Sequence, residues 1–327
     1  MVKLIDSFGR VHTYLRISVT DRCNLRCMYC MPEEGIKWKQ KEEILTYEEL
    51  FRIAKLLVSM GVNKIRITGG EPLVRKDIES LISSLSSIKG LNRLSMTTNA
   101  LLLKDNAYKL KLCGLQSLNV SLDTLQKDKF IWITKRDKLN HVLEGINSAL
   151  VCGFTPLKLN VVVIKGINDD EIMDFVSFVK DKPINIRFIE FMPFENNRWD
   201  YSKLVPYEKM KNVIQGKYEL IPIKGNKSDV AKDFCIEGFQ GTVSFITSMT
   251  ENFCSSCNRI RLTADGSFKT CLFHKPECNL RAFLRTEASN SKISEMILQA
   301  LKLKKIGHEP LEELANIENQ SMIQIGG

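Results

Sequence analysis

The sequence lacks any long apolar run, and no segment approaches the roughly 18 consecutive apolar residues of a membrane-spanning helix. Residues 1–6 also lack the apolar core of a secretory signal, so we expect a cytoplasmic location. The formal net charge is +9, but the basic residues are scattered, without a block of five or six. This dispersion is typical of a solvated basic surface, while the overall excess favours an anionic partner such as a polyphosphate or a nucleic acid.

The sequence also lacks low-complexity tracts, simple tandem repeats and a glycine-rich phosphate loop of the Walker type. The last absence excludes nucleotide hydrolysis by P-loop machinery. What is present is a chain of 327 residues with 44% hydrophobic content, enough for one large and one smaller domain. Its ten cysteines are unevenly spread, with three at 23–30 and four at 254–278. In a cytoplasmic protein such groups indicate metal or redox chemistry rather than disulfides.

The first cysteine group, Cys23, Cys27 and Cys30, directly follows a strand-like run at residues 15–19. Its odd number and short loop prevent all three thiols from pairing as disulfides. Thiolates are ligands of iron–sulfur clusters, and three of them on a four-iron cluster leave one iron free for a small molecule. The alternative is a zinc site or redox-active thiols. The spacing, with Tyr29 before the last cysteine, resembles the radical S-adenosylmethionine (SAM) superfamily and implies a [4Fe–4S] cluster.

Strand and helix patterns alternate after this loop. Thr46 and Glu49 predict a capping box at the first helix. The alternation implies parallel βαβ units, and about six fit between residues 14 and 192, too few for an eight-stranded barrel. We therefore predict a partial TIM barrel with functional residues at the carboxyl ends of its strands, spanning residues 1–192, and a smaller region at 193–327. Strands are expected at 64–68, 93–97, 118–122, 159–164 and 184–191, and helices at 50–60, 78–87, near 110, 141–152, 171–179 and 293–301.

The segment Gly69-Gly70-Glu71-Pro72 follows one of these strands directly. A glycine pair alone mostly marks an ordinary turn. Beside the cysteine loop, the segment resembles the superfamily motif that contacts the amino-acid moiety of SAM. For Met192, core packing would otherwise be the better interpretation. The resemblance implies SAM contacts at Gly70, at Tyr29 near the adenine, at Ser121 and at Met192.

The second cysteine group comprises Cys254, Cys257 and Cys271, with Cys278 six residues further on. From spacing alone, this arrangement predicts a structural zinc site as readily as an iron–sulfur cluster. The chain also resembles one family nearly end to end, the GTP 3',8-cyclases of molybdenum cofactor biosynthesis. The segments that carry this resemblance are 15–24, 64–72, 165–170, 187–192, 254–271 and the terminal Gly326-Gly327.

The resemblance implies a second [4Fe–4S] cluster on Cys254, Cys257 and Cys271, whose free iron binds the guanine of GTP. Cys278 lies outside this set and is interpreted as a bystander. Ala100 stands where the family usually has glycine. The resemblance implies that the glycine tail reaches the active site. The alternative is that it is an ordinary frayed terminus.

Several basic residues are candidates for holding the triphosphate. Arg259 and Arg261 follow the second cysteine pair, and guanidinium groups suit polyphosphate oxygens. Arg16 and Arg66 each alternate with aliphatic residues along their own predicted strands. Both therefore point to the same face of the sheet, which we expect to line the barrel. A charge there needs a partner. The resemblance assigns GTP contacts to Arg16, Arg66, Thr97, Lys158, Arg259, Ile260 and Arg261.

The implied function is radical SAM cyclisation of GTP to (8S)-3',8-cyclo-7,8-dihydroguanosine 5'-triphosphate. The first cluster cleaves SAM, the 5'-deoxyadenosyl radical abstracts H3' of GTP, and the resulting C3' radical attacks guanine C8. Arg259 or Arg261 then assists reduction of the closed ring.

The implied partners are GTP, a flavodoxin- or ferredoxin-like electron donor, the next pathway enzyme, cyclic pyranopterin monophosphate synthase, and a second copy of the chain. Neither a membrane nor a nucleic acid is expected. One alternative is a radical SAM enzyme that modifies a peptide or RNA. The other is a zinc-containing nucleic-acid-binding protein, which the positive charge permits.

Overall fold

The computed structural model describes residues 3–31, 35–195, 197–225, 228–286, 288–314 and 319–326. The strands are β1 (Tyr14–Ser18), β2 (Lys64–Thr68), β3 (Arg93–Thr98), β4 (Ser117–Ser121), β5 (Leu157–Val163), β6 (Ile184–Glu190), β7 (Ile221–Pro222), β8 (Ala231–Cys235), β9 (Thr242–Ile246), β10 (Arg259–Leu262), β11 (Ser267–Lys269) and β12 (Cys278–Asn279). The α-helices are α1 (Tyr47–Ser59), α2 (Ile78–Ser86), α3 (Leu103–Leu112), α4 (Lys127–Thr134), α5 (Leu139–Val151), α6 (Ile172–Phe178), α7 (Tyr207–Gln215), α8 (Arg281–Arg285), α9 (Asn290–Lys302), α10 (Leu311–Leu314) and α11 (Met322–Ile325).

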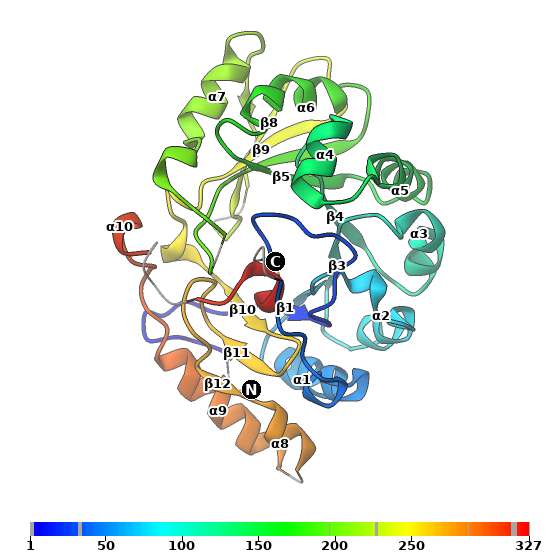
Figure 1. The fold of residues 1–327 in the computed structure, drawn as a ribbon. Coiled ribbons are helices and arrows are strands. Elements are labelled where there is room, and N and C mark those ends of the chain that lie inside the picture. Colours follow the sequence, from blue (N-terminus) through cyan, green and yellow to red (C-terminus); the bar gives the residue numbers. More distant parts are fainter. Residues whose placement is uncertain are drawn as a thin grey trace.

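All described strands belong to one mixed sheet with the order β12-β11-β10-β1-β2-β3-β4-β5-β6-β9-β8-β7. The strands from β10 through β1–β6 to β9 run parallel, and the outer strands at both edges are antiparallel. The sheet curves, and the helices that connect β1 to β6 cover its outer face (Figure 1). The predicted α/β fold of the partial-barrel type is confirmed, with six consecutive parallel strands and the ring left open.

The chain beyond residue 192 extends this sheet at both edges. On one side β10 pairs with β1, with Arg259 opposite Tyr14. On the other side β9 pairs with β6, with Phe245 opposite Phe188. The rings of Phe188 and Phe245 lie 6.0 Å apart and join this edge to the core. The two predicted regions therefore share one sheet.

Side-chain alternation along the strands separates the core from the lumen. In β5, Leu157, Leu159 and Val161 are buried, whereas Lys158 and Asn160 line the interior of the curved sheet. Such alternation is expected because successive strand residues point to opposite faces. Apolar residues thus pack against the helices, while polar residues remain available for a ligand.

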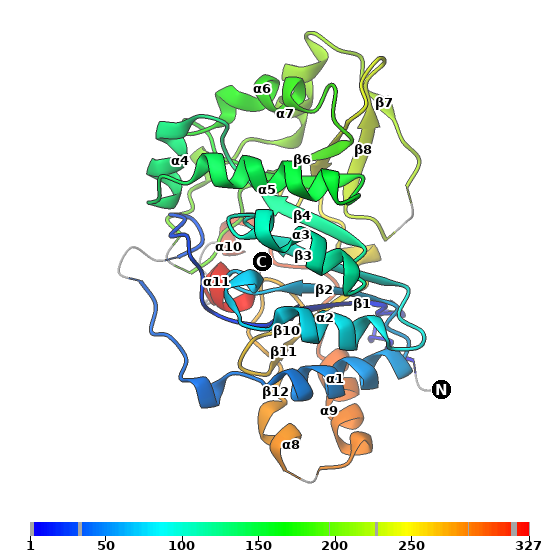
Figure 2. The same ribbon diagram turned by 90° about the vertical axis from the view of Figure 1, so that its right-hand side faces the viewer.

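The predicted capping box of α1 is present, with Glu49 N–H donating to Thr46 Oγ1 at 3.2 Å and Thr46 N–H donating to Glu49 at 2.7 Å. The short helix α11 lies inside the curve of the sheet in both perpendicular views (Figures 1 and 2).

Among the described residues, no helix combines the length and apolar character needed to cross a membrane.

Candidate active site

A cavity of about 830 Å³ lies inside the curved sheet and is lined from both its parallel strands and the two cysteine groups. This volume is within the range of ligand-binding cavities. The structure thus brings together residues that are far apart in the sequence. The predicted site residues that line it are Arg16, Cys23, Cys27, Tyr29, Cys30, Arg66, Gly70, Thr97, Ser121, Lys158, Met192, Cys254, Cys257, Arg259, Arg261 and Cys271.

Ile260 is the predicted site residue that does not line the cavity. Its side chain is fully buried in the hydrophobic core, because β10 alternates and Arg259 and Arg261 occupy the opposite face. Any contact of Ile260 with a ligand would therefore come from its main chain.

The first cysteine loop is held by the end of α4. Arg26 N–H donates to Thr134 O at 3.0 Å, and Met28 N–H donates to Ile133 O at 3.0 Å. Cys23, Cys27 and Cys30 are free thiols, so this loop offers three sulfur donors to one cavity.

Two donors approach the sulfur of Cys23, the Leu25 N–H at 3.4 Å and the Asn99 amide at 3.8 Å. Burial raises the pKa of the Cys23 thiol to about 11, so binding of iron must displace its proton. Donors to sulfur stabilise thiolate ligands. This donor set fits a cluster held by three thiolates.

Gly70 occupies a position where only glycine fits. Its N–H donates to Thr20 O at 2.7 Å, and a Cβ atom built on it would lie 2.3 Å from Arg22 O. The close approach brings the motif against the chain just before the cysteine loop. Glu71 is buried and accepts from Asn99 N–H at 2.6 Å and Leu73 N–H at 3.0 Å, so its carboxylate fixes neighbouring loops.

Tyr29 is fixed by a carboxylate that the sequence analysis missed. Its hydroxyl donates to Asp123 Oδ2 at 2.5 Å, and Asp123 Oδ1 accepts from Val162 N–H at 2.8 Å. Burial raises the pKa of Asp123 to about 6. Because Asp123 lies two residues beyond Ser121, the alternation that places Ser121 in the cavity could have indicated Asp123 as well.

The second cysteine group is assembled by the β10–β11 hairpin. Cys254 and Cys257 precede β10, and Cys271 follows β11, which pairs antiparallel with β10. Among the described residues, no group of three or more His, Cys, Asp or Glu side chains is arranged to hold a single metal ion. Cys278 is on β12 opposite Phe268 and is not among the described residues that line the cavity.

Positive charge surrounds the second group. Burial alone would raise the pKa of Cys257, but the charges of Arg259 and Lys304 outweigh burial and lower this pKa to about 6. The ammonium of Lys304 lies 3.8 Å from the Cys257 sulfur and donates to Arg259 O at 3.1 Å. These positive charges therefore stabilise the thiolate form of the second cysteine group, which is the form that binds iron.

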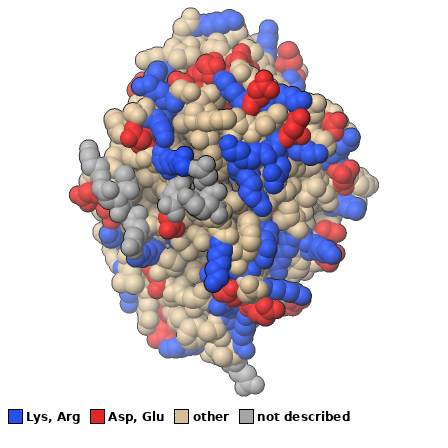
Figure 3. Space-filling view, in the orientation of Figure 1, with Lys and Arg blue, Asp and Glu red and all other residues tan. Residues whose placement is uncertain are grey.

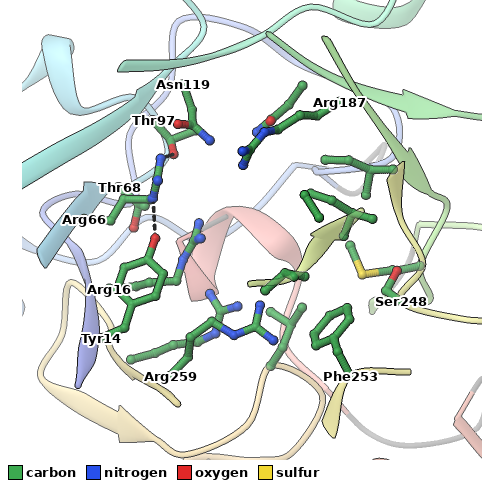
Figure 4. Close-up of a pocket in the computed structure, with 18 of the residues that line it drawn as sticks. Tyr14, Arg16, Arg66, Thr68, Thr97, Asn119, Arg187, Ser248, Phe253 and Arg259 are labelled. Atoms are coloured by element: carbon green, nitrogen blue, oxygen red, sulfur yellow. Dashed lines mark hydrogen bonds between the residues drawn. The ribbon is translucent and has the colours of Figure 1, made fainter. Parts of the chain in front are cut away.

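Arginines from separate strands converge on the cavity. Figure 4 shows Arg16, Arg187 and Arg259 pointing into a shared space from β1, β6 and β10. On the outer surface, Lys and Arg side chains gather near the middle of the face in Figure 3. Buried Arg16 Nε and Arg261 Nη1 have no hydrogen-bond partner within the described structure. Because an unpaired buried charge is costly, these atoms fit an anionic ligand.

Further cavity residues escaped the sequence analysis. Tyr14, Lys64, Asn119, Asn160 and Arg187 all line the cavity. Tyr14 and Lys64 lie two residues before Arg16 and Arg66, whose alternation the sequence showed, and Asn119 and Asn160 lie two residues from Ser121 and Lys158, which the resemblance indicated, so these four share the strand faces of predicted site residues. Arg187 belongs to a segment used for the family resemblance, but it had no assigned role.

Met192 and the glycine tail lie at other parts of the site. Met192 lies two residues after the end of β6 and, like Phe194, packs against a small hydrophobic cluster. Gly326 O accepts from Thr68 Oγ1 at 3.2 Å, and a Cβ atom on Gly326 would lie 2.5 Å from Ser18 Cβ. The described end of the tail therefore lies against β1 and β2, whereas Gly327 is outside the described residues.

Two family models match successive parts of the chain. The Radical SAM superfamily matches residues 17–179, and Molybdenum Cofactor Synthesis C matches residues 184–310. A relative from Arabidopsis thaliana, named GTP 3',8-cyclase, mitochondrial, is 52% identical over 325 residues, covering 99% of this chain and 83% of the relative. The GTP 3',8-cyclase of Clostridium botulinum is 44% identical, covering 99% of this chain and 100% of the relative.

Molybdenum cofactor biosynthesis protein 1 of Dictyostelium discoideum is 49% identical over 327 residues. The chain spans 52% of that relative's length. Solved structures resemble the fold at much lower identity. Streptococcus suis SuiB has a TM-score of 0.60 at 14% identity, covering 88% of this chain and 69% of that chain. Native anSMEcpe, with bound AdoMet and Cp18Cys peptide, has a TM-score of 0.53 at 14% identity, covering 89% and 84% respectively.

The fold, the cysteine-lined cavity and the relatives that match over nearly the whole chain agree. The two family models also follow one another along the sequence in the order that the resemblance predicts. The chain belongs to the GTP 3',8-cyclase family within the radical SAM superfamily.

Proposed function

We propose that the chain cyclises GTP to (8S)-3',8-cyclo-7,8-dihydroguanosine 5'-triphosphate, the first step of molybdenum cofactor biosynthesis. The observation that carries this proposal is that two separate groups of three free cysteines line one cavity. Each group is one protein ligand short of completing a four-iron cluster. Relatives named GTP 3',8-cyclase, at 52% and 44% identity, support the same function.

Members of the radical SAM superfamily use a [4Fe–4S] cluster and SAM. When bound, these groups supply a radical that abstracts hydrogen from the substrate, while the protein positions the reactants and excludes water. We assign the cluster to Cys23, Cys27 and Cys30. Asp123 would orient Tyr29 through its 2.5 Å hydrogen bond. The SAM contacts that we propose are Tyr29, Gly70, Ser121 and Met192.

We assign a second [4Fe–4S] cluster, with guanine as its ligand, to Cys254, Cys257 and Cys271. The unpartnered nitrogens of Arg16 and Arg261 support a triphosphate in the same cavity. Arg259 or Arg261 would also stabilise reduction of the closed ring. Accurate placement is needed because an error of about 1 Å can cost about a hundredfold in rate. The GTP contacts that we propose are Arg16, Arg66, Thr97, Lys158, Arg259, Arg261 and the main chain of Ile260.

Further assignments come from the sequence patterns and from the family resemblance. We retain the division into a partial barrel at residues 1–192 and a C-terminal region at 193–327. We also retain a cytoplasmic location, a flavodoxin- or ferredoxin-like electron donor, transfer of product to cyclic pyranopterin monophosphate synthase, and a homodimer. The comparisons favour neither a zinc-containing nucleic-acid-binding protein nor an enzyme that modifies a peptide or RNA.

The function is tested by incubating anaerobically purified protein with GTP, SAM and dithionite. We expect GTP-dependent formation of 5'-deoxyadenosine together with the cyclised nucleotide, in a protein holding about eight irons per chain. Omitting GTP, or replacing Cys23 by serine, should remove both products. Zinc without sulfide, or SAM cleavage without a cyclised nucleotide, would contradict the proposal.

A further inference from the structure

Tyr14 is a buried cavity residue to which neither the sequence motifs nor the proposed reaction assigns a role. It is the first residue of β1, only 8% exposed, and lies between Lys64 of β2 and Arg259 of β10 in the strand registers. Its hydroxyl oxygen accepts from Arg66 Nε at 2.5 Å (Figure 4). Arg66 also donates to Thr97 Oγ1 at 3.3 Å, so two oxygens fix its guanidinium.

The surroundings of Tyr14 are almost entirely cationic. The ammonium of Lys64 lies 4.3 Å from the centre of the Tyr14 ring, and the guanidinium carbon of Arg66 lies 6.0 Å from it. The charged groups around Tyr14 are Arg16 on its own strand, Lys64 and Arg66 on β2, Arg187 on β6, Arg259 on β10, and Asp229, which attracts Lys64 and Arg187.

Charge in this environment favours the ionised phenol. Burial alone would raise the pKa of Tyr14, but the charges of Arg66, Arg16 and Lys64 outweigh burial and lower the pKa to about 7. A phenolate would then balance part of the positive charge while no substrate is bound. A triphosphate entering the same cavity would replace that negative charge with its own.

We propose that Tyr14 is a positioning residue of the triphosphate subsite. Its oxygen anchors Arg66 and acts as a replaceable counter-anion, so that nucleoside triphosphate binding is coupled to the uptake of one proton from solvent by Tyr14. This inference rests on the proposed function, because GTP is taken as the ligand. The charge balances: a phenolate and a solvent proton become a neutral phenol as the polyanion enters.

The coupling has a definite pH signature. Above the pKa of Tyr14, the phenolate competes with the triphosphate for the same cations, so GTP affinity should fall as pH rises. One linked proton corresponds to a decrease of about tenfold per pH unit. Lys158 contributes in the same direction, because burial and the charges of Arg187 and Arg66 lower its pKa to about 7. A Lys158→Arg background removes that second titration while retaining positive charge.

The test is isothermal titration of the anaerobic iron–sulfur holoprotein with GTP at pH 8, in buffers that differ in ionisation enthalpy. In the Lys158→Arg background, the chain with Tyr14 should take up about one proton more than Tyr14→Phe. Tyr14→Gln retains an acceptor for Arg66 but cannot ionise, so it should bind GTP without the additional proton. Tyr108→Phe, at an exposed tyrosine of α3, serves as the matched control and should change nothing.

The outcomes separate this inference from the function on which it rests. Equal proton uptake by the Tyr14 chain and by either non-ionising variant would overturn the inference while leaving GTP binding intact. Absence of GTP binding to the unsubstituted holoprotein would contradict both. If Tyr14→Phe fails to fold, the Tyr14→Gln comparison decides between these outcomes.

Discussion

Cys278 differs from the six cysteines that line the cavity. It is held opposite Phe268 in the β11–β12 pair, and burial raises its pKa to about 11. We expect Cys278→Ser to retain both clusters and the full rate of turnover, because serine has nearly the same size and no cluster ligand is lost. Iron and sulfide analysis with the anaerobic activity assay would check this result. Cys271→Ser is the matched variant and should lose about half of the iron; loss of iron from Cys278→Ser would contradict our ligand assignment.

Ala100 has a left-handed backbone conformation, with φ at 63°, at the position where the resemblance expects glycine. A left-handed residue with a Cβ costs about 1–2 kcal/mol, whereas glycine loses about 0.4–1 kcal/mol through the flexibility of the unfolded chain. The Ala100 side chain is also fully buried in the core, and deleting its methyl group costs about 0.8 kcal/mol. We therefore expect Ala100→Gly to change the free energy of unfolding by less than about 0.5 kcal/mol, as measured by anaerobic urea denaturation.

Ala107→Gly provides the control, because Ala107 lies within α3 and glycine lowers helix stability by about 1 kcal/mol. If both substitutions reduced stability by similar amounts, the strain assigned to Ala100 would be wrong.

At the scale of elements, the N-terminal segment that contains the Ile5–Val11 bridge is tied to the second cysteine group by Arg10. The Arg10 guanidinium donates to Cys254 O at 2.7 Å, Ile306 O at 2.7 Å and Lys305 O at 2.6 Å. Lysine cannot reproduce this fork of donors. We expect Arg10→Lys to speed chelator-induced loss of the second cluster about tenfold, equivalent to about 1.4 kcal/mol, while the first cluster is unaffected.

Iron release followed by cluster-resolved spectroscopy measures this difference. Arg285→Lys is the matched control, because Arg285 of α8 contacts Glu49 of α1 instead of the cysteine loops. Equal acceleration for both clusters, or for both variants, would contradict a specific role of Arg10 in the second group.

The sequence predicted those strands and helices whose residue pattern and flanking breaks are clear within a short stretch of chain. β2 has the predicted bounds, Lys64–Thr68, because apolar and basic residues alternate there between clear breaks. α4 was missed because the consecutive apolar residues from Phe130 to Ile133 show no helical spacing. The pairing of β10 with β1 was also missed. These strands are more than 200 residues apart, and no local pattern specifies which distant strands become neighbours.

At the scale of the molecule, features of the site that are local in the chain could be predicted from the sequence, whereas contacts between distant strands could not. Cysteine spacing indicated two groups of thiols, and both groups line the cavity, because each is largely local in the chain; the ligand sets themselves rest on the family resemblance. The hydrogen bond between Tyr29 and Asp123 and the contact between Tyr14 and Arg66 join different strands. Such contacts depend on how strands converge around the cavity, which one sequence does not specify. Side-chain alternation nevertheless restricts the candidates to one face of each strand.

The central claim is that two incompletely ligated clusters share one cavity, so that the radical source and the bound nucleotide meet. The most direct measurement follows deuterium from C3'-deuterated GTP during anaerobic turnover with SAM and dithionite. Our account predicts deuterium in the 5'-deoxyadenosine formed. Label retained in the nucleotide, with unlabelled 5'-deoxyadenosine produced at the same rate without GTP, would contradict it.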